Sequence, residues 1–362
     1  MIVDAHLHAF PHMGGASGYP DAASHLAMQQ AKIRSWWGRM LTSETDERYI
    51  PLPGEDVGFR AGRFGRYYWT KHGRPCWLQR FPLTMEEMEW SAERMVANMD
   101  AIGVDAGLLQ AGYMNIDYCR EYFQECVRRF PGRLYASVSI DYDIRKDEAH
   151  RRGELGKLAR AVREAGARAL YQGYPKGQEI DDSRFDPFWR TLCELGTPHI
   201  LLTGFEPVRQ YLDSLQRLAR VIRRFPDLTL VIGHLGGNVR PASHPGYTAT
   251  PDELMPLLQT RNVHFEVGYV LAYEHPDSWG AAYEYPYPEH ERLIRRVYEA
   301  VGADRLLWGS DMPNVERTCT YRQCLDLVRL HCGFLSPGEK RQVLGANAAA
   351  LFKIDATREA QE

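Results

Sequence analysis

The sequence predicts an α/β fold of the (β/α)8 barrel type, and two observations support this prediction. From about residue 84 onward, short β-branched or Leu-rich runs alternate with longer segments whose apolar residues recur at helical spacing, which indicates parallel strands joined by helices. Eight runs suit a strand, and eight strands close such a barrel. The alternative is a doubly wound open sheet, but no GxGxxG or GxxxxGKS/T motif follows any of the runs.

The predicted strands and helices run from the N-terminus almost to the end of the chain. The strands are Ile2–His8, Ala106–Gln110, Leu134–Ile140, Ala167–Gln172, His199–Thr203, Leu228–Gly233, Val263–Val267 and Arg305–Gly309. The helices are Met85–Ile102, Tyr118–Phe130, Glu148–Ala165, Phe185–Leu195, Pro207–Phe225, Asp252–Gln259, Glu289–Val301 and Tyr321–Cys332. Several helices are followed directly by glycine, as in Ile102-Gly103, which is typical of a helix C-terminus.

Two segments do not fit the alternation and are predicted to be insertions in one barrel domain of residues 1–355, which a tail of residues 356–362 follows. Residues 11–83 are rich in Gly, Pro, Arg and aromatic residues, and residues 268–290 are aromatic and acidic. Since long loops at the catalytic face of a barrel are usually functional, we expect residues 11–83 to be either a cap that offers aromatic walls and an Arg for a carboxylate, or a subunit contact. Substrate contacts are predicted for four residues, which are Tyr171, Trp69, Arg74 and Trp77.

The composition favours a small molecule as the partner. The 362 residues include 44 basic and 47 acidic side chains, a net charge of −3, so there is no basic field of the kind that binds nucleic acid or anionic lipid. No apolar run is long enough for a membrane span, and the opening MIVDAHLHAF does not fit a signal peptide, so a cytoplasmic location is expected. The seven cysteines form no CxxC pair, which argues against a disulfide framework. We expect a homo-oligomer, a dimer.

Two histidines on the first predicted strand suggest a metal. His6 and His8 are two residues apart, so both imidazoles point to the same face at the end of the strand. Inside a barrel that face is the interior, where two neutral imidazoles suit a transition metal. Asp4 lies deeper on the same face and is expected to orient one of the imidazoles or to be a capped polar group at the barrel floor.

Two further polar residues follow later strands. His234 lies in Val231–Gly237, directly after an apolar strand, and Asp311 lies in Trp308–Pro313, at the end of the last strand. A buried carboxylate is costly unless it binds a cation or accepts hydrogen bonds. Each residue alone has a structural explanation, but four polar residues at the ends of strands 1, 6 and 8 predict one functional site.

These motifs, together with Leu344–Ala348, Met99–Asp105 and Arg184–Phe188, resemble those of the amidohydrolase superfamily. The resemblance is to the metal-dependent barrel hydrolases and decarboxylases related to aminocarboxymuconate semialdehyde decarboxylase, and it covers the chain outside the two insertions. It implies that His6, His8 and Asp311 hold a divalent metal and that Asp311 also handles the proton of the attacking water. It further implies that His234 polarises the substrate or shuttles a proton.

The fifth strand departs from that family pattern, because Leu202 stands where the family has a histidine ligand. His199 cannot replace it, since an offset of three residues puts its side chain on the opposite face. Three protein ligands still make an open zinc site, with manganese as the alternative ion. Glu266 or Glu206 is a candidate for the missing ligand, and a site that works without metal is the third possibility.

The predicted function is therefore a metal-dependent hydrolase that acts with activated water on a small carbonyl compound, a lactone, an amide or a related C–O or C–N bond. The first alternative is a non-oxidative decarboxylase, a carboxy-lyase, of an aromatic or unsaturated acid, in which Asp311 or His234 delivers a proton to carbon. The second is a binding protein that has lost catalysis. The retained His234 and Asp311 argue against this second alternative, because a simple pocket gains little from a buried carboxylate.

Overall fold

The computed structural model describes residues 1–38, 40–173, 178–201, 208–236, 255–268 and 284–355. Eight parallel strands form one sheet in the order β1-β5-β6-β7-β8-β9-β10-β11. They are β1 (Val3–Leu7), β5 (Ala106–Leu109), β6 (Leu134–Val138), β7 (Ala169–Gln172), β8 (His199–Leu201), β9 (Leu230–Ile232), β10 (Val263–Val267) and β11 (Leu306–Trp308). A parallel bridge between Leu7 and Met312 joins the two ends of the sheet. The predicted (β/α)8 barrel is therefore confirmed.

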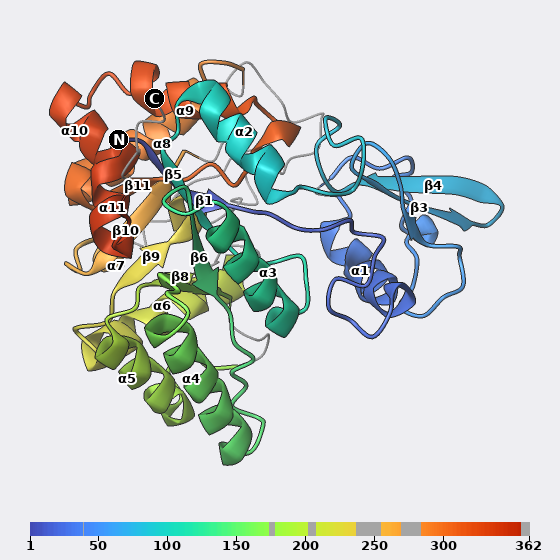
Figure 1. The fold of residues 1–362 in the computed structure, drawn as a ribbon, viewed down its shortest axis with the longest axis horizontal. Helices are drawn as coiled ribbons and strands as arrows, with labels where there is room; N and C mark the ends of the chain where they lie inside the picture. The colour runs from blue at the N-terminus through green and yellow to red at the C-terminus, as the bar shows by residue number, and fades with distance from the viewer. Residues whose placement is uncertain (39, 174–177, 202–207, 237–254, 269–283, 356–362) are drawn as a thin grey trace.

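Helices follow most of the strands and surround the sheet (Figure 1). They are α2 (Ala92–Ile102), α3 (Ile116–Arg129), α4 (Glu148–Arg163), α5 (Asp186–Leu195), α6 (Val208–Arg224), α7 (Met255–Leu258), α8 (Pro288–Val301), α9 (Tyr321–Asp326), α10 (Pro337–Arg341) and α11 (Asn347–Phe352). Two predicted helices differ clearly in extent, and the others differ by one or two residues at an end within the described residues. The helix expected from Met85 begins only at Ala92, because Trp90 pairs through its backbone with Phe10 and Ser91 caps the helix. The helix expected over Tyr321–Cys332 continues after α9 as a π-helical turn, Leu327–His331.

Residues 11–83 form a unit beside the barrel (Figure 1). It contains α1 (Ala22–Trp36), a short 3-10 helix at Glu47–Tyr49 and an antiparallel sheet of β2 (Arg60–Ala61), β3 (Arg66–Lys71) and β4 (Arg74–Gln79). Tyr67 and Trp69 point to one side of β3 and are buried. Its backbone is tied to the barrel at several points, among them Asn115 N–H to the Ser17 carbonyl. Most of the second predicted insertion and the predicted tail lie outside the described residues.

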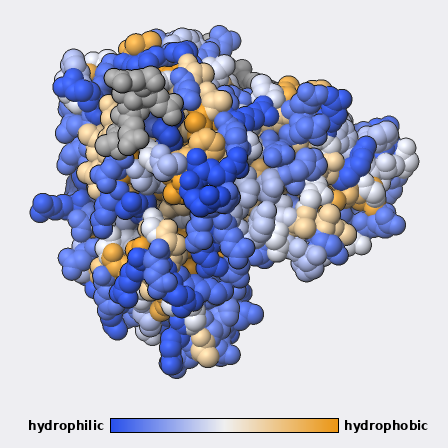
Figure 2. Space-filling view, in the orientation of Figure 1, coloured by the Kyte–Doolittle hydropathy of each residue, from blue (hydrophilic) through white to orange (hydrophobic). Residues whose placement is uncertain are grey.

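The core is formed by the strands and by the inner faces of the helices, where Leu, Val, Ile and aromatic side chains are buried. Polar residues cover most of the face in Figure 2, with apolar residues scattered between them. Among the described helices, none has the length and apolar character that a membrane crossing requires. Against this apolar interior, a cluster of buried ionisable side chains at one end of the barrel stands out: His6, His8, His234, Glu266 and Asp311.

Candidate active site

Two backbone hydrogen bonds close the barrel where the cluster lies. The Asp311 N–H donates to the His6 carbonyl at 2.9 Å, and the His8 N–H donates to the Met312 carbonyl at 2.8 Å. The side chains of His6 and His8 point to the same face of β1 because they are two residues apart. The first strand and the segment after the last strand thus bring together two imidazoles and one carboxylate, which the sequence predicts.

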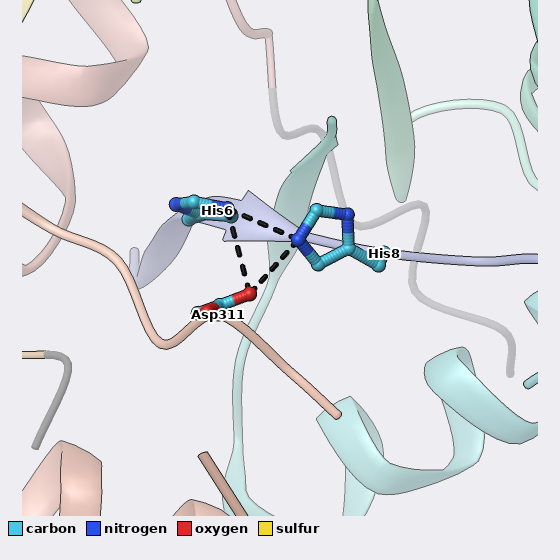
Figure 3. Close-up of side chains that lie close together, drawn as sticks. All are labelled: His6, His8 and Asp311. Atoms are coloured by element: carbon cyan, nitrogen blue, oxygen red, sulfur yellow. Dashed lines mark hydrogen bonds and ion pairs between the residues drawn. The ribbon is translucent and has the colours of Figure 1, made fainter. Parts of the chain in front are cut away.

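The three side chains form a small triangle of donor atoms (Figure 3). The Nε2 atoms of His6 and His8 are 3.2 Å apart. Asp311 Oδ1 lies 2.8 Å from Nε2 of His8 and 3.6 Å from Nε2 of His6. Two nitrogens and one oxygen therefore point at the same small volume, at hydrogen-bond and ion-pair distances from one another.

The other ring nitrogen of each imidazole, Nδ1, forms a hydrogen bond with an acceptor in the protein. His8 Nδ1 lies 2.6 Å from the Gln110 carbonyl, which can only accept, so His8 donates from Nδ1. His6 Nδ1 lies 2.9 and 3.0 Å from the two carboxylate oxygens of Glu266. A neutral ring that donates from Nδ1 carries a lone pair on Nε2. This arrangement, in which an outer acceptor fixes the tautomer, is typical of histidines that bind metals.

The electrostatics of the cluster favour one positive charge among its side chains. Burial opposes the charged form of His6, but Glu266 and Asp311 outweigh burial and raise the pKa of His6 to about 9. Burial also opposes the Asp311 carboxylate, but the neighbouring His6 and His8 hold the pKa of Asp311 well below its usual range. Burial lowers the pKa of His8. Two buried carboxylates thus share one positive charge, which either a proton on His6 or a bound ion supplies.

The triangle also has the right dimensions for a metal. A zinc ion with bonds of about 2.0–2.1 Å in a tetrahedral site separates its ligand atoms by roughly 3.4 Å. The observed separations of 3.2, 2.8 and 3.6 Å are centred near that value. Two imidazoles and a carboxylate are a normal donor set for a catalytic zinc site that keeps a fourth position open. His6, His8 and Asp311 therefore fit a divalent ion.

His234 completes the cluster and lies next to both His6 and Glu266. Its ring stacks on that of His6, with centroids 5.1 Å apart, and its Nδ1 lies 3.4 Å from Oε1 of Glu266. Burial lowers the pKa of His234, so its ring is neutral at pH 7. The backbone φ of His234 is 51° and that of Asp311 is 58°, both in the left-handed region. Residues other than glycine whose backbone is held in this unfavourable conformation are concentrated at functional sites.

Three supporting residues were not found from the sequence. Asn314 Nδ2 donates to Oδ1 of Asp311 at 2.7 Å and also to the hydroxyl of Tyr113. Gln110 contributes its backbone carbonyl to His8, as described above. Asn314 could have been proposed because it follows Asp311 by three residues. The Gln110 carbonyl reaches His8 because of the register between β1 and β5. Every residue has a backbone carbonyl, so the residue type at position 110 gives no signal of this role.

The other residues that the sequence singles out have the following places. Asp4 is a capped polar group, the second of the two expectations for it, because its carboxylate accepts from the backbone N–H of His6 and of Ser310. Glu266 orients an imidazole, at Nδ1 of His6. His199 is buried against α5 and bonds the Gln172 carbonyl, away from the cluster. Both Leu202 and Glu206 lie outside the described residues.

The predicted substrate-binding residues divide into two groups. Tyr171 lies against the cluster, with ring centroids 5.5 Å from His6 and 6.3 Å from His8. The recorded contacts of Trp69, Arg74 and Trp77 lie within the unit of residues 11–83. Trp69, for example, donates to the Tyr49 carbonyl. The structure therefore brings only Tyr171 of these four to the imidazoles by a described contact.

Sequence comparisons give one family and one curated relative. The family model described as amidohydrolase matches residues 3–354. L-fucono-1,5-lactonase of Burkholderia ambifaria is 28% identical over 216 residues, which cover 56% of this chain. The matched region spans 66% of the length of that relative.

Solved structures with the same fold include hydrolases and a decarboxylase. An amidohydrolase of Burkholderia multivorans with bound HEPES has a TM-score of 0.62 at 15% identity and covers 98% of this chain and 100% of its own. A probable 2-pyrone-4,6-dicarboxylic acid hydrolase of Acinetobacter baumannii has a TM-score of 0.59 at 15% identity and covers 97% and 99%. The 5-carboxyvanillate decarboxylase of Sphingomonas paucimobilis has a TM-score of 0.53 at 15% identity and covers 76% and 86%. These low identities support the shared barrel and no more.

Proposed function

The chain belongs to the amidohydrolase family, and on that premise we propose that it is a metal-dependent hydrolase of a small carbonyl compound, a lactone in the first instance. The observation that carries the proposal is the triangle of His6, His8 and Asp311, whose donor atoms face one another at 2.8–3.6 Å. The similarity of this chain to the L-fucono-1,5-lactonase of Burkholderia ambifaria is the reason for proposing a lactone rather than another carbonyl compound.

The residues that would hold the metal are His6, His8 and Asp311, and zinc is the ion we propose, with manganese as the alternative. A divalent ion there supplies a Lewis acid that polarises a carbonyl group. Glu266 fixes the ring of His6 by accepting from Nδ1, and the Gln110 carbonyl does the same for His8. Both imidazoles thereby present Nε2 to the site without any rearrangement.

The remaining groups of the cluster provide proton transfer and orientation. Asp311 is ionised, so its carboxylate accepts a proton from the attacking water and returns it to the leaving oxygen. Asn314 holds that carboxylate in place from Nδ2. His234 is neutral and donates a hydrogen bond to the oxygen on which negative charge develops. Tyr171 forms a wall beside the two imidazoles.

Non-oxidative decarboxylation needs the same cluster without a water nucleophile, so product analysis separates the two reactions. Purified protein is incubated with a panel of lactones, amides and hydroxybenzoates, and released acid and released CO2 are both measured. Acid released from a lactone, and its loss in Asp311→Asn, is the expected result. CO2 released from any member of the panel, without acid from the lactones, would contradict the proposed hydrolysis.

We also propose that the enzyme works in the cytoplasm as a homodimer on a small-molecule substrate. The basis is the near balance of charge and the unit of residues 11–83, which offers a surface beside the barrel. Sedimentation at several protein concentrations tests the dimer: a single species of one chain at every concentration would contradict it.

A further inference from the structure

One guanidinium close to the cluster has no role in the hydrolysis described above. Arg80 follows β4, and its Cζ lies 4.7 Å from the ring centroid of Trp36, 4.8 Å from that of Phe81 and 5.2 Å from that of Tyr113. Rings on several sides hold the planar group by cation–π contacts. Within the described part of the chain, no carboxylate lies within ion-pair distance of this guanidinium and no acceptor bonds its N–H groups.

Neighbouring arginines of the same unit are paired in the usual way. Arg63 forms an ion pair with Glu86, Arg74 pairs with Glu44, and Arg66 donates to the side chain of Gln79. Arg80 is partly buried among apolar rings, where an uncompensated charge costs more than it does in water. An arginine that keeps its five donors unused in such a place is suited to bind an anion from outside the chain.

A buried hydroxyl without a partner lies in the same group of side chains as Arg80, because Tyr67 and Arg80 both lie against the ring of Trp36. Tyr67 is buried, its ring stacks on Trp36, and its hydroxyl finds no hydrogen-bond partner among the described residues. A buried hydroxyl without a partner costs about 1–3 kcal/mol. An anion bound at Arg80 that accepted from this hydroxyl would supply the missing hydrogen bond.

Tyr113 connects this group to the metal-binding triangle. Its ring centroid lies 4.9 Å from that of His8, and its hydroxyl accepts from Asn314, the residue that holds Asp311. The two steps of 4.9 and 5.2 Å place Arg80 Cζ within about 10 Å of the His8 ring. This separation is within the length of one small molecule.

The backbone fixes Arg80 in this position. The Gly65 carbonyl accepts from the N–H groups of both Arg80 and Phe81, at 2.9 Å each. Gly65 has a φ of +73°, and a Cβ there would lie 2.4 Å from the Phe81 carbonyl oxygen, so only glycine permits this pairing. The Arg80 carbonyl in turn accepts from Arg317 of the barrel at 3.1 Å. The backbone of Arg80 is thus fixed by hydrogen bonds to Gly65 and to Arg317, which lies in the segment after β11.

We propose that Arg80, with the Tyr67 hydroxyl, binds a carboxylate of the substrate, so that the enzyme acts on carbonyl compounds that carry a carboxylate within about 10 Å of the reacting carbonyl. The guanidinium has its faces against rings and its edge available, which suits a planar carboxylate bound by two parallel hydrogen bonds. This inference names the substrate class and rests on the proposed function.

Direct binding tests the subsite without any turnover. Glutarate, adipate and pimelate are titrated calorimetrically into the metal-loaded protein, and the monoamide of each acid is the matched neutral-ended probe. Hydrogen bonds to a charged group contribute about 1.5–3 kcal/mol, so we expect at least one diacid to bind about ten- to hundredfold more tightly than its monoamide. Arg80→Gln should abolish this difference, and Tyr67→Phe should reduce it about two- to tenfold.

Arg60→Gln is the matched control, because Arg60 is an exposed arginine of the same unit that also lies over a tyrosine ring, that of Tyr68. It should leave the diacid preference unchanged. Equal binding of diacid and monoamide by the wild-type protein, or a preference that survives in Arg80→Gln, would overturn the subsite. Tighter binding of inorganic phosphate than of any diacid would overturn the assignment to a carboxylate.

The two proposals fail in distinguishable ways. If no lactone or amide is hydrolysed but the diacid preference depends on Arg80, the subsite stands and the reaction is wrong. If neutral lactones are hydrolysed as fast as their carboxylate-bearing analogues, and Arg80→Gln changes kcat/KM for neither, the reaction stands and the subsite is wrong. With both correct, Arg80→Gln lowers kcat/KM about ten- to hundredfold for the carboxylate-bearing lactone only.

Discussion

At the scale of single residues, the cluster is organised by which ring nitrogen is left unbonded. His6 and His8 each give Nδ1 to an acceptor in the protein, which leaves two Nε2 atoms and Asp311 Oδ1 to face one another. No hydrogen-bond pattern satisfies three such atoms without a proton or a metal ion. The raised pKa of His6, about 9 where burial alone would lower it, has the same cause. The site is therefore built to hold positive charge.

Asp311→Asn tests the proton-accepting role at this scale. Asparagine keeps the size of the side chain but cannot take up a proton, so kcat is expected to fall by about 10²–10⁴ on the best lactone of the panel. Asp117→Asn, which changes an exposed carboxylate at the start of α3, is the matched control and should retain full activity. Near-normal turnover by Asp311→Asn would rule the role out.

The residue types of the cluster could be predicted from the sequence, but their partners could not. His6 lies near the end of β1, and His8, His234 and Asp311 come directly after or close behind strands; alternation along β1 places His6 and His8 on one side. The acceptor for His6 depends instead on how β10 lies relative to β1, which brings Glu266 to Nδ1 and leaves Asp4 to bond backbone N–H groups. The distance between Glu266 and His6 is set by the closure of the barrel, and the local sequence around either residue does not predict it.

At the scale of elements, the residue that follows β11, Gly309, must lack a side chain for the cluster to form. A Cβ at Gly309 would lie 2.8 Å from Cγ of Glu266 and 3.0 Å from Cβ of His6. Contacts this short require the neighbours to move. Since Glu266 touches His6 through its carboxylate, any displacement acts directly on the orientation of that ring.

Gly309→Ala is therefore expected to destabilise the protein by about 1–3 kcal/mol and to lower its affinity for zinc about 10- to 100-fold. Urea unfolding and a competition titration with a zinc indicator measure the two effects. Gly153→Ala is the control, because Gly153 lies exposed within α4 with nothing near its Cβ position. It should stabilise by about 0.5–1 kcal/mol. Unchanged zinc affinity in Gly309→Ala would contradict the role given to Glu266.

The elements also show where sequence patterns were sufficient. Apolar runs located every strand of the barrel, because each strand is buried and reads as a short apolar segment. The antiparallel sheet of residues 60–79 was not predicted, since its two longer strands, RYYWTK and RPCWLQ, show no regular alternation of apolar and polar residues and lie in a segment rich in Gly and Pro. The buried Tyr67 and Trp69 two residues apart on β3 are the signal that could have revealed it.

At the scale of the whole molecule, buried neutral histidines outside the site make stability depend on pH. Burial lowers the pKa of His199 to about 4, below the ordinary value of about 6.5. The folded protein keeps this ring neutral while the unfolded chain takes up a proton. The contribution is fully favourable above pH 6.5 and is lost progressively as the pH falls toward 4.

Wild-type protein is therefore expected to lose about 2–3 kcal/mol of unfolding free energy through His199 between pH 7 and pH 4.5. His199→Gln removes this titration, so its unfolding free energy should fall less over the same interval, whatever its value at pH 7. Denaturant unfolding at both pH values measures the difference. Parallel losses in the two proteins would show that His199 does not titrate in this way.

The account depends most on the claim that the first strand and the segment after the last strand share one cation. Metal content by plasma mass spectrometry, after loading with zinc or manganese and removal of free ion, tests it directly. We expect about one equivalent in the wild type and less than about a tenth in His6→Ala/His8→Ala, with both proteins folded by circular dichroism. Less than about a tenth of an equivalent in both, with either ion, would contradict the claim.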